Sequence, residues 1–168
     1  SDLMGVMLPY APLQLLLFSY NDGLHMPDLL VMTSANRSGM PICRTDEEVR
    51  TDLPGLCDLI LSHDRDILLR VDDSVVTVSA DEPYMIRRSR GYAPLPIHVN
   101  GDFHGTVLSA GGELKNTVCL AKDNLFYLSP HIGDVGCVRS EAAQHECAER
   151  LRDLLEITPQ CGAADIHP

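Results

Sequence analysis

Short polar side chains follow the apolar run Leu29–Met32, because residues 34–39 read Ser-Ala-Asn-Arg-Ser-Gly. An apolar run of this length predicts a buried strand, and ligands of α/β sheets bind beyond the carboxyl ends of strands. Hydroxyl and amide side chains at such a place can bind phosphate or ribose oxygens together with backbone N–H groups. We therefore expect Ser34, Asn36 and Ser38 to bind a nucleotide. The alternative is a strand-ending turn in which these side chains bond their own backbone.

A second apolar run, Leu56–Ser62, also predicts a buried strand and is followed directly by His63-Asp64-Arg65. Neighbours in sequence rarely form a catalytic dyad, so we expect His63 to bond backbone or phosphate rather than to act as a general base. Arginines recur from here on, and Asp72 lies among them. Clustered arginines suit a small anion, whereas the alternative is an exposed strand face. The arginines of this group are Arg65, Arg70, Arg87, Arg88 and Arg90.

A third group of polar residues begins with two glycines, in the stretch Gly111-Gly112-Glu-Leu-Lys115-Asn116. Two glycines followed by a lysine can bring backbone amides and an ammonium group to a phosphate, although a Gly-Gly turn with an exposed lysine explains the same letters. His131 and Asp134 lie in a loop before a predicted helix, a frequent location of functional residues. His145, within that helix, fits a solvated or packed side chain better than a ligand.

Composition limits the classes of protein to which the chain can belong. The 168 residues are 45% hydrophobic, enough for the core of one domain or two small ones. A net charge of −11 argues against binding to nucleic acid or to an anionic membrane surface. The six cysteines form no CxxC pair, and no apolar stretch is long enough to span a bilayer. We therefore expect a soluble cytoplasmic protein with reduced thiols, without a zinc ribbon or a disulfide scaffold, and without metal-ligand residues of its own.

Hydrophobic periodicity and turn residues predict the elements that position these groups. A core helix is expected at Leu13–Phe18, a short helix after Thr45 with a capping box to Glu48, and a long helix from Ser140 whose apolar face carries Cys147, Leu151, Leu154 and Leu155. Besides the two buried runs, strands are expected at Gly5–Leu8, Val75–Ser79, Tyr84–Ser89, Thr106–Ser109, Thr117–Ala121 and Leu125–Ser129.

A change of composition after Gly91 predicts a domain boundary. Residues 92–101 are rich in proline and then form a turn, as in an extended connector. We expect an α/β protein with one unit at residues 1–97, a linker at 98–105 and a second unit at 106–168.

Taken together, the motifs resemble those of the hydrogenase maturation carbamoyltransferases, the HypF family. The first part resembles the family's YrdC-like domain, and the second resembles the start of its actin-like, threonylcarbamoyl-transferase-type ATPase domain. The motifs are Leu8-Pro9-Tyr10-x-Pro12-Leu13, Thr33-Ser34-Ala35-Asn36-x-Ser38-Gly39, His63-Asp64-Arg65, Arg70-x-Asp72-Asp73-Ser74-Val75, Arg87-Arg88-x-Arg90-Gly91-Tyr92, Gly111-Gly112-Glu113-Leu114-Lys115-Asn116-Thr117, Ser129-x-His131-Ile132-Gly133-Asp134 and Asp165-x-His167-Pro168. The expected fold is then a partial, twisted α/β YrdC-like domain followed by the beginning of an actin-like α/β domain.

The resemblance implies a reaction with ATP and carbamoyl phosphate as substrates and with Mg²⁺. Carbamoyl-adenylate forms first, and its carbamoyl group then passes to the C-terminal cysteine of a HypE-type acceptor, for the cyanide ligand of [NiFe]-hydrogenase. Ser34 and Asn36 match the family's nucleotide contacts, and Arg88 and Arg90 are the expected catalytic contacts to phosphate or carboxyl groups. Gly111, Gly112, Lys115, Asn116, His131 and Asp134 are expected at the second site, with His63, Arg65, Arg70 and Asp72 as further candidates.

Several parts of the family pattern have no counterpart in this sequence. These are the acylphosphatase-like domain, the zinc-binding cysteine pairs, the front half of the YrdC-like domain and the metal-binding histidine motif of the second domain. We therefore expect zinc and the second-domain metal only in other parts of the family protein, and no turnover by this segment alone. Ala11 and Gln14 also depart from the family's threonine and histidine. Two alternatives stay open: a threonylcarbamoyl-adenylate synthase-like protein of tRNA modification, and a non-catalytic module that binds nucleotide or a partner.

Overall fold

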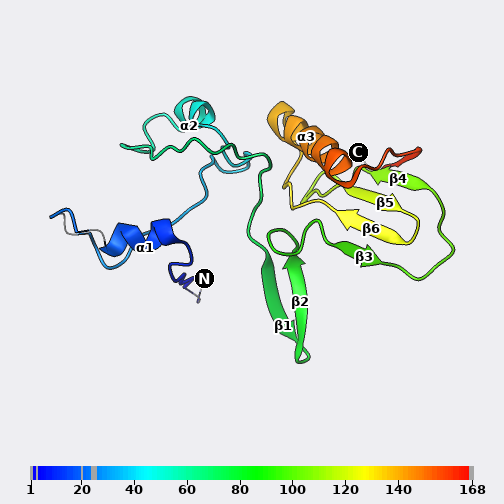
Figure 1. Cartoon of the computed structure of the whole chain (residues 1–168), viewed down its shortest axis with the longest axis horizontal. Coiled ribbons are helices and arrows are strands. Elements are labelled where there is room, and N and C mark those ends of the chain that lie inside the picture. Colours follow the sequence, from blue (N-terminus) through cyan, green and yellow to red (C-terminus); the bar gives the residue numbers. More distant parts are fainter. Residues whose placement is uncertain (1, 3, 20, 24–25, 167–168) are drawn as a thin grey trace. The chain divides into compact units, whose positions relative to one another are not determined.

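The computed structural model describes residues 2, 4–19, 21–23 and 26–166 (Figure 1). The chain divides into unit 1, Ser1–Ser34, and a larger unit 2, Ala35–Pro168. His167 and Pro168, the end of the last motif, lie outside the described residues.

Unit 1 contains the helix α1, Pro12–Ser19. Proline suits the first turn of a helix, and the Gln14 side-chain oxygen accepts the N–H groups of Tyr10 and Ala11 at 2.9 and 3.1 Å. Gln14, a departure from the family pattern, therefore caps the helix. The predicted helix is confirmed, but its predicted burial is wrong, because no residue of α1 is buried.

The strands expected at Gly5–Leu8 and Leu29–Met32 are not formed by these residues, all of which the structure describes. Leu29 and Val31 are 86% and 95% exposed. A strand needs a neighbouring strand for its backbone N–H and C=O groups, and within the described part of unit 1 there is none. The sheet edge predicted before Ser34 is therefore not formed, because an apolar sequence alone does not make a strand.

Unit 2 begins with a loop and the short helix α2, Asp46–Asp52. The Thr45 hydroxyl accepts the Glu48 N–H at 3.2 Å, which confirms the predicted N-cap. The Glu48 carboxylate reaches back to the N–H of Arg44, one residue beyond the Thr45 N–H that a capping box would use. The strand expected at Leu56–Ser62 is absent from these described residues, which form turns and irregular backbone instead.

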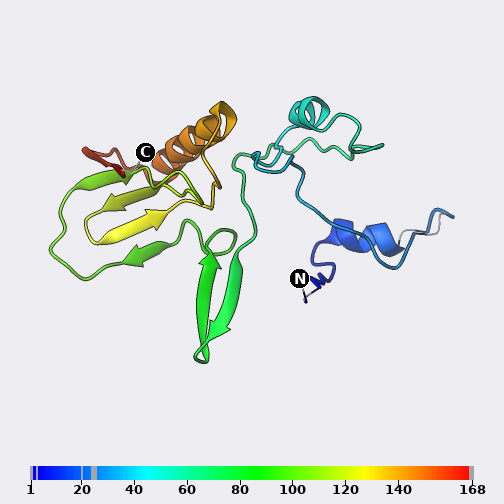
Figure 2. The same ribbon diagram turned by 180° about the vertical axis from the view of Figure 1, so that it is seen from behind.

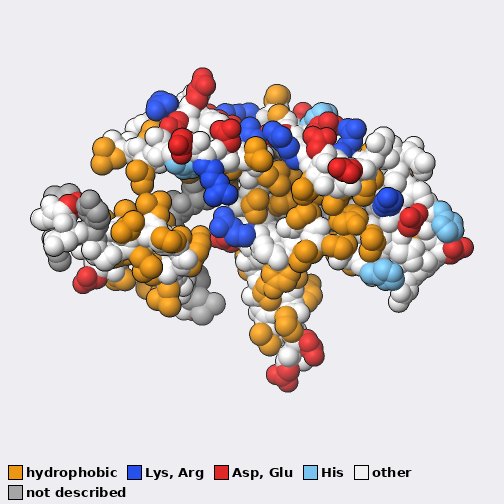
Figure 3. All heavy atoms as spheres, in the orientation of Figure 1, with side chains coloured by type: hydrophobic (Ala, Val, Ile, Leu, Met, Phe, Trp, Pro, Cys, Tyr) orange, Lys and Arg blue, Asp and Glu red, His pale blue; other side chains and the backbone are white. Residues whose placement is uncertain are grey.

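A β-hairpin follows, made of β1, Val75–Ser79, and β2, Glu82–Arg87. The strands pair antiparallel, as predicted. Ala80 and Asp81 both have positive φ angles, 52° and 63°, so they form the tight two-residue turn that matches the twist of a hairpin. Apolar side chains cover much of the hairpin surface (Figure 3).

The main sheet has five strands in the order β3-β6-β5-β4-β7. The strands β4, β5 and β6 form an antiparallel meander, β3 pairs antiparallel with β6, and β7 pairs parallel with β4 (Figure 2). Their bounds are β3 Pro96–His98, β4 Thr106–Ser109, β5 Cys119–Lys122, β6 Leu125–Leu128 and β7 Cys161–Ala163. The three predicted strands of the meander are thus confirmed: β4 has the predicted bounds, and the ends of β5 and β6 differ from the prediction by at most two residues.

The helix α3, Val138–Leu155, packs on this sheet. It begins two residues before the predicted start, because the Ser140 hydroxyl accepts the N–H of its N-cap residue Cys137 at 3.2 Å. Leu151 joins the buried cluster of Val118, Leu120 and Ile157. Leu155 packs against this cluster, whereas Leu154 is 66% exposed, so its predicted place on the apolar face is wrong. No helix in the described part of the chain is long and apolar enough to cross a membrane.

Helices and sheets are mixed in the chain, which confirms the α/β class. The connector differs from the prediction in one respect, because Pro96–His98 forms the edge strand β3 of the main sheet. Proline is tolerated in an edge strand, where its missing N–H need not bond a neighbour. The units proposed at 1–97 and 106–168, with a linker at 98–105, stay a prediction.

Candidate functional site

The glycine turn before β5 is folded around the side chain of Asn116. This asparagine is buried, and its amide nitrogen donates to the carbonyls of Ala110 at 2.9 Å and Gly112 at 2.6 Å. Gly111 has a φ of +70°, and a Cβ built there would lie 2.4 Å from the Thr117 carbonyl oxygen. Only glycine fits this position, so the turn needs both residue types that the sequence analysis singled out.

The loop that holds His131 and Asp134 runs alongside this turn. The Asn116 N–H donates to the Gly133 carbonyl at 2.8 Å, and the Asn116 carbonyl accepts the Ile132 N–H at 2.9 Å. The Asp134 carboxylate accepts the Lys115 N–H at 2.8 Å. The structure therefore brings together the six residues predicted for the second site. We call them the glycine-turn site: Gly111, Gly112, Lys115, Asn116, His131 and Asp134.

His131 is half-buried within the glycine-turn site. Burial and the nearby positive charge of Arg87 lower the pKa of its imidazole, although Asp72 and Asp134 act in the opposite direction. His131 is therefore a neutral donor and acceptor at pH 7 rather than a cation. Asp72, predicted as a further candidate from the first half of the chain, pairs with Arg87 at 3.1 Å and so lies within electrostatic range of this site.

The loop that carries Asn36 and Ser38 folds onto itself. The Asn36 amide nitrogen donates to the Met40 carbonyl at 2.7 Å, and the Cys43 N–H donates to the Ala35 carbonyl at 2.8 Å. Asn36 therefore does bond its own loop, as the alternative interpretation of this motif holds. Ser38 is exposed in a turn before Gly39, which has a positive φ of 76°. Ser34 belongs to unit 1, so its expected shared surface with Asn36 stays a prediction.

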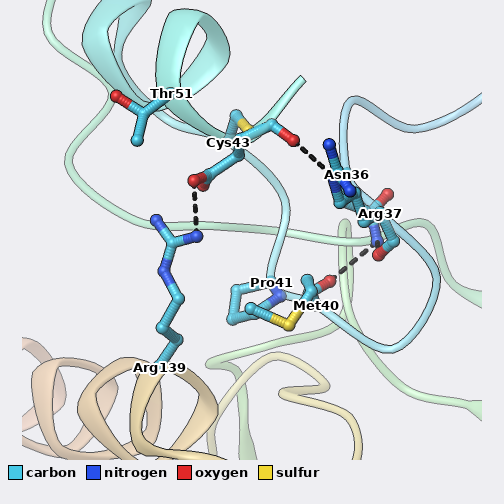
Figure 4. A pocket seen from close by; sticks show the side chains of 8 residues that line it. Asn36, Arg37, Met40, Pro41, Cys43, Thr51 and Arg139 are labelled. Atoms are coloured by element: carbon cyan, nitrogen blue, oxygen red, sulfur yellow. Dashed lines mark hydrogen bonds and ion pairs between the residues drawn. The ribbon is translucent and has the colours of Figure 1, made fainter. Parts of the chain in front are cut away.

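A cavity of about 210 Å³ opens beside Asn36 (Figure 4). Arg139, near the start of α3, points into this region and pairs with Asp52 of α2 at 2.5 Å. The Asp52 hydrogen bond raises the pKa of Arg139, and burial raises the pKa of the Cys43 thiol, with Asp52 and Glu48 adding to that effect. The lining residues are Asn36, Arg37, Met40, Pro41, Cys43, Thr51, Asp52 and Arg139. Sequence reasoning missed Arg139, because nothing local distinguishes it from any other charged residue of a first helical turn.

The structure does not gather the arginines into one positive group. Arg70 pairs with Glu48 at 2.6 Å and Glu146 at 2.8 Å, whereas Arg88 donates to the carbonyls of Tyr92 and Leu95, both at 2.7 Å. Arg70, Arg87 and Arg90 each pair with at least one carboxylate, so their charges are largely compensated in place.

The remaining candidates of the first half are exposed. Arg90 lies 3.5 Å from an Asp73 oxygen and is 58% exposed, which leaves its guanidinium within reach of solvent. His63 accepts the Arg65 N–H at 3.1 Å. This bond to backbone is one of the two roles expected for His63.

Glu48 gives the ion pairs a measurable pH dependence. Burial opposes its charge, but the Arg44 N–H, the Arg70 guanidinium and the Thr45 cap outweigh burial and lower the pKa of Glu48. A lowered folded pKa contributes stability that is complete above the ordinary glutamate value of about 4.3 and is lost as the pH falls through the folded value.

Between pH 7 and pH 3, we expect the free energy of unfolding, measured with urea, to fall less in Glu48→Gln than in the wild type. Glu47→Gln, an exposed position of the same helix, should keep the wild-type slope, and equal slopes in all three proteins would contradict the assignment.

Comparisons with known proteins identify the family. The profile of the Sua5/YciO/YrdC family, described as telomere recombination, matches residues 1–89, and that of the HypF Kae1-like domain matches residues 102–168. Carbamoyltransferase HypF2 of Cupriavidus necator is 43% identical, and the match covers 98% of this chain and 22% of the relative. Carbamoyltransferase HypF of Rhizobium leguminosarum is 36% identical over 98% of this chain and 22% of its own length. A probable carbamoyltransferase HypF of Methanocaldococcus jannaschii is 42% identical over 99% and 21%.

Solved structures agree with the sequence matches. A full-length HypF in a phosphate- and nucleotide-bound form has a TM-score of 0.75 at 39% identity, covering 81% of this chain and 22% of that one. HypF of T. kodakarensis has a TM-score of 0.75 at 38% identity, covering 82% and 18%. The chain thus spans about a fifth of the length of the relatives it matches. It belongs to the HypF carbamoyltransferase family, with a YrdC-like part followed by a Kae1-like part.

Proposed function

We propose that this segment supplies parts of two nucleotide sites of an ATP-dependent carbamoyltransferase, one at the Asn36 loop and one at the glycine-turn site. The observation that carries the proposal is the turn folded around buried Asn116, where Gly111 and Gly112 leave backbone close to the surface. Such a turn suits phosphate oxygens. The names of the relatives support a carbamoyltransferase, and the phosphate- and nucleotide-bound form of one solved HypF supports the same ligands.

The proposed first step makes carbamoyl-adenylate. Water cleaves carbamoyl phosphate to carbamate and phosphate, a carbamate oxygen then attacks the α-phosphorus of ATP, and pyrophosphate leaves. Neither bond change needs a covalent link to the enzyme, so positioning and charge stabilisation are the main catalytic devices. In this step Asn36, Ser38 and Ser34 would hold the nucleotide, and Arg90, exposed beside Asp73, is better placed than Arg88 to meet a phosphate or carboxyl group.

The proposed second step transfers the carbamoyl group. The C-terminal cysteine thiolate of a HypE-type acceptor attacks the carbamoyl carbon, and the carbon–oxygen bond to AMP breaks. The glycine-turn site would bind phosphate through its backbone N–H groups and the Lys115 ammonium, while neutral His131 orients a polar group of the substrate.

Magnesium would arrive with the nucleotide, because Mg²⁺ is commonly bound by one or two carboxylates together with substrate phosphates. Among the described residues no group of three or more His, Cys, Asp or Glu side chains could hold a metal ion. A nucleotide-bound Mg²⁺ needs only one or two carboxylates. Asp134 can supply one, since the bond that it accepts from the Lys115 N–H places its carboxylate at the glycine turn. Mg²⁺ would there neutralise phosphate charge.

Replacing Asn36 with alanine tests the first site. We expect carbamoyl phosphate-dependent ATP–pyrophosphate exchange by the full-length protein to fall by about 10- to 150-fold, because a hydrogen bond to a charged group contributes about 1.5–3 kcal/mol. Asn124→Ala is the matched control, since the Asn124 amide also donates to a backbone carbonyl, that of Gly101 at 2.9 Å. Unchanged exchange and unchanged ATP affinity in Asn36→Ala would contradict the role of Asn36.

The same assay separates the two enzymatic interpretations. A carbamoyltransferase needs carbamoyl phosphate for exchange, whereas a threonylcarbamoyl-adenylate synthase needs threonine and bicarbonate. We expect exchange with carbamoyl phosphate alone. Exchange only with threonine and bicarbonate would favour the tRNA-modification protein, and no exchange with either set would favour a non-catalytic binding module.

A further inference from the structure

Four charged side chains link α2 and its neighbouring loops to α3. Glu146 of α3 pairs with both Arg44 and Arg70, and Arg70 also pairs with Glu48 of α2. The exposed fractions of the four side chains lie between 21% and 28%. We call these residues, two arginines and two glutamates, the α2–α3 charge cluster. Three of them come from the part that matches the YrdC family and one from the part that matches the Kae1-like domain.

The charge cluster also holds the loop that carries Asn36. The Arg70 Nε donates to the Ile42 carbonyl at 2.7 Å, while its Nη1 donates to Glu146 at 2.8 Å. One guanidinium therefore joins the loop to α3. The planar guanidinium of Arg70 can bond the Ile42 carbonyl and Glu146 together only in one orientation, and Glu146 is the residue of α3 that fixes this orientation.

A second ion pair connects the same elements two helical turns away. Arg139 and Glu146 are seven residues apart in α3, so they lie on the same side of the helix. Arg139 pairs with Asp52 at the end of α2, and the Asp52 carbonyl accepts the Arg37 Nε at 2.6 Å. Both ends of the Asn36–Cys43 loop are thus tied to α3 through charged side chains.

We infer that the α2–α3 charge cluster and the Arg139–Asp52 pair together form an electrostatic latch between the YrdC-like and Kae1-like parts, and that Glu146 is its positioning residue. Paired, half-buried charges hold a loop in one geometry, whereas removing one partner leaves another charge uncompensated. The latch fixes the Asn36 loop against the helix that packs on the Kae1-like sheet. Through the proposed function, it would couple nucleotide binding in one part to the geometry of the other.

The physical test is hydrogen–deuterium exchange of residues 36–53 in the full-length protein. In Glu146→Gln we expect these amides to exchange about tenfold faster or more, because local opening becomes easier. Glu146→Asp, which keeps the charge, should recover part of the protection. Glu149→Gln is the matched control, since Glu149 lies on the same helix and pairs with Arg152, three residues further along it. Exchange in Glu146→Gln equal to that in the control would overturn the latch.

A charge swap keeps the test decisive if Glu146→Gln folds poorly. Arg139→Asp should speed exchange of residues 36–53, and the double variant Arg139→Asp with Asp52→Arg should restore protection. Failure of the double variant to restore it would overturn the direct link between α2 and α3.

The kinetic readout distinguishes the latch from the proposed function on which its coupling role rests. We expect Glu146→Gln to raise KM for ATP with a smaller change in kcat, because a misplaced loop weakens binding before it alters the chemical step. Faster exchange with an unchanged KM would confirm the latch and contradict the nucleotide role of Asn36.

Discussion

Replacing Gly111 with alanine is expected to lower carbamoyl transfer by the full-length protein at least about 100-fold, since losing one preorganised donor of a reaction site has an effect of about 10²–10³. The Cβ would stand 2.4 Å from the Thr117 carbonyl oxygen, and that backbone leads into β5, so it cannot move away without disturbing the sheet. The backbone at φ +70° is also unfavourable for alanine. Transfer to a peptide ending in cysteine, followed by mass spectrometry of the carbamoylated thiol, measures the loss.

Gly133→Ala separates backbone strain from steric contact. Gly133 has a φ of +102°, but a Cβ there would meet no atom within 4 Å. This control should lower stability through strain alone, by about 1–3 kcal/mol, and change transfer less than Gly111→Ala does. Equal transfer rates in the two variants would mean that the shape of the glycine turn does not matter for the reaction.

Leu120→Ala is expected to produce the largest loss of stability. Leu120 is fully buried in β5, where it packs with Val118, Leu151 and Ile157. Truncating a buried leucine lowers the free energy of unfolding by about 2–5 kcal/mol, because transfer energy is lost and a cavity remains. Thermal or urea unfolding measures this effect.

Leu154→Ala is the matched control for the core variant. Leu154 lies on α3 but is 66% exposed, so we expect its removal to change stability by less than about 0.5 kcal/mol. A loss in Leu154→Ala as large as that in Leu120→Ala would mean that the exposed face of α3 is covered in solution.

The sequence predicted those elements that are specified by nearby residues. The hairpin, the β4-β5-β6 meander and α3 form from neighbours in the chain, through turn residues and caps such as Ala80-Asp81 and Ser140. The runs Leu29–Met32 and Leu56–Ser62 are just as apolar. The structure describes all of their residues, and neither run forms a strand. A strand depends on a partner, and periodicity carries no information about whether one is present.

The candidate site shows the same division. Gly111, Lys115 and Asn116 could be grouped from the sequence, because glycines, a lysine and an asparagine at close spacing mark a turn that suits an anion. Asp134 lies further along the chain, and only the family resemblance assigns it to the same site. The roles of Arg139 and Glu146 could not be predicted in this way. Glu146 pairs with Arg44 and Arg70, which lie 102 and 76 residues away in the chain, and Arg139 pairs with Asp52 of another helix. Contacts of this range depend on the packing of α3 and leave no local signal.

The parallel pairing of β7 with β4 suggests an order of assembly for the main sheet. The meander closes through tight turns, whereas the bond from the Gln160 N–H to the Thr106 hydroxyl joins residues separated by 54 positions. Closing so long a loop is slow until α3 has packed and shortened the distance that the chain must span. We therefore expect β7 to dock last and leave first, so that destabilising substitutions in Cys161–Ala163 accelerate unfolding while the rate of folding, measured by stopped-flow refolding, stays nearly constant.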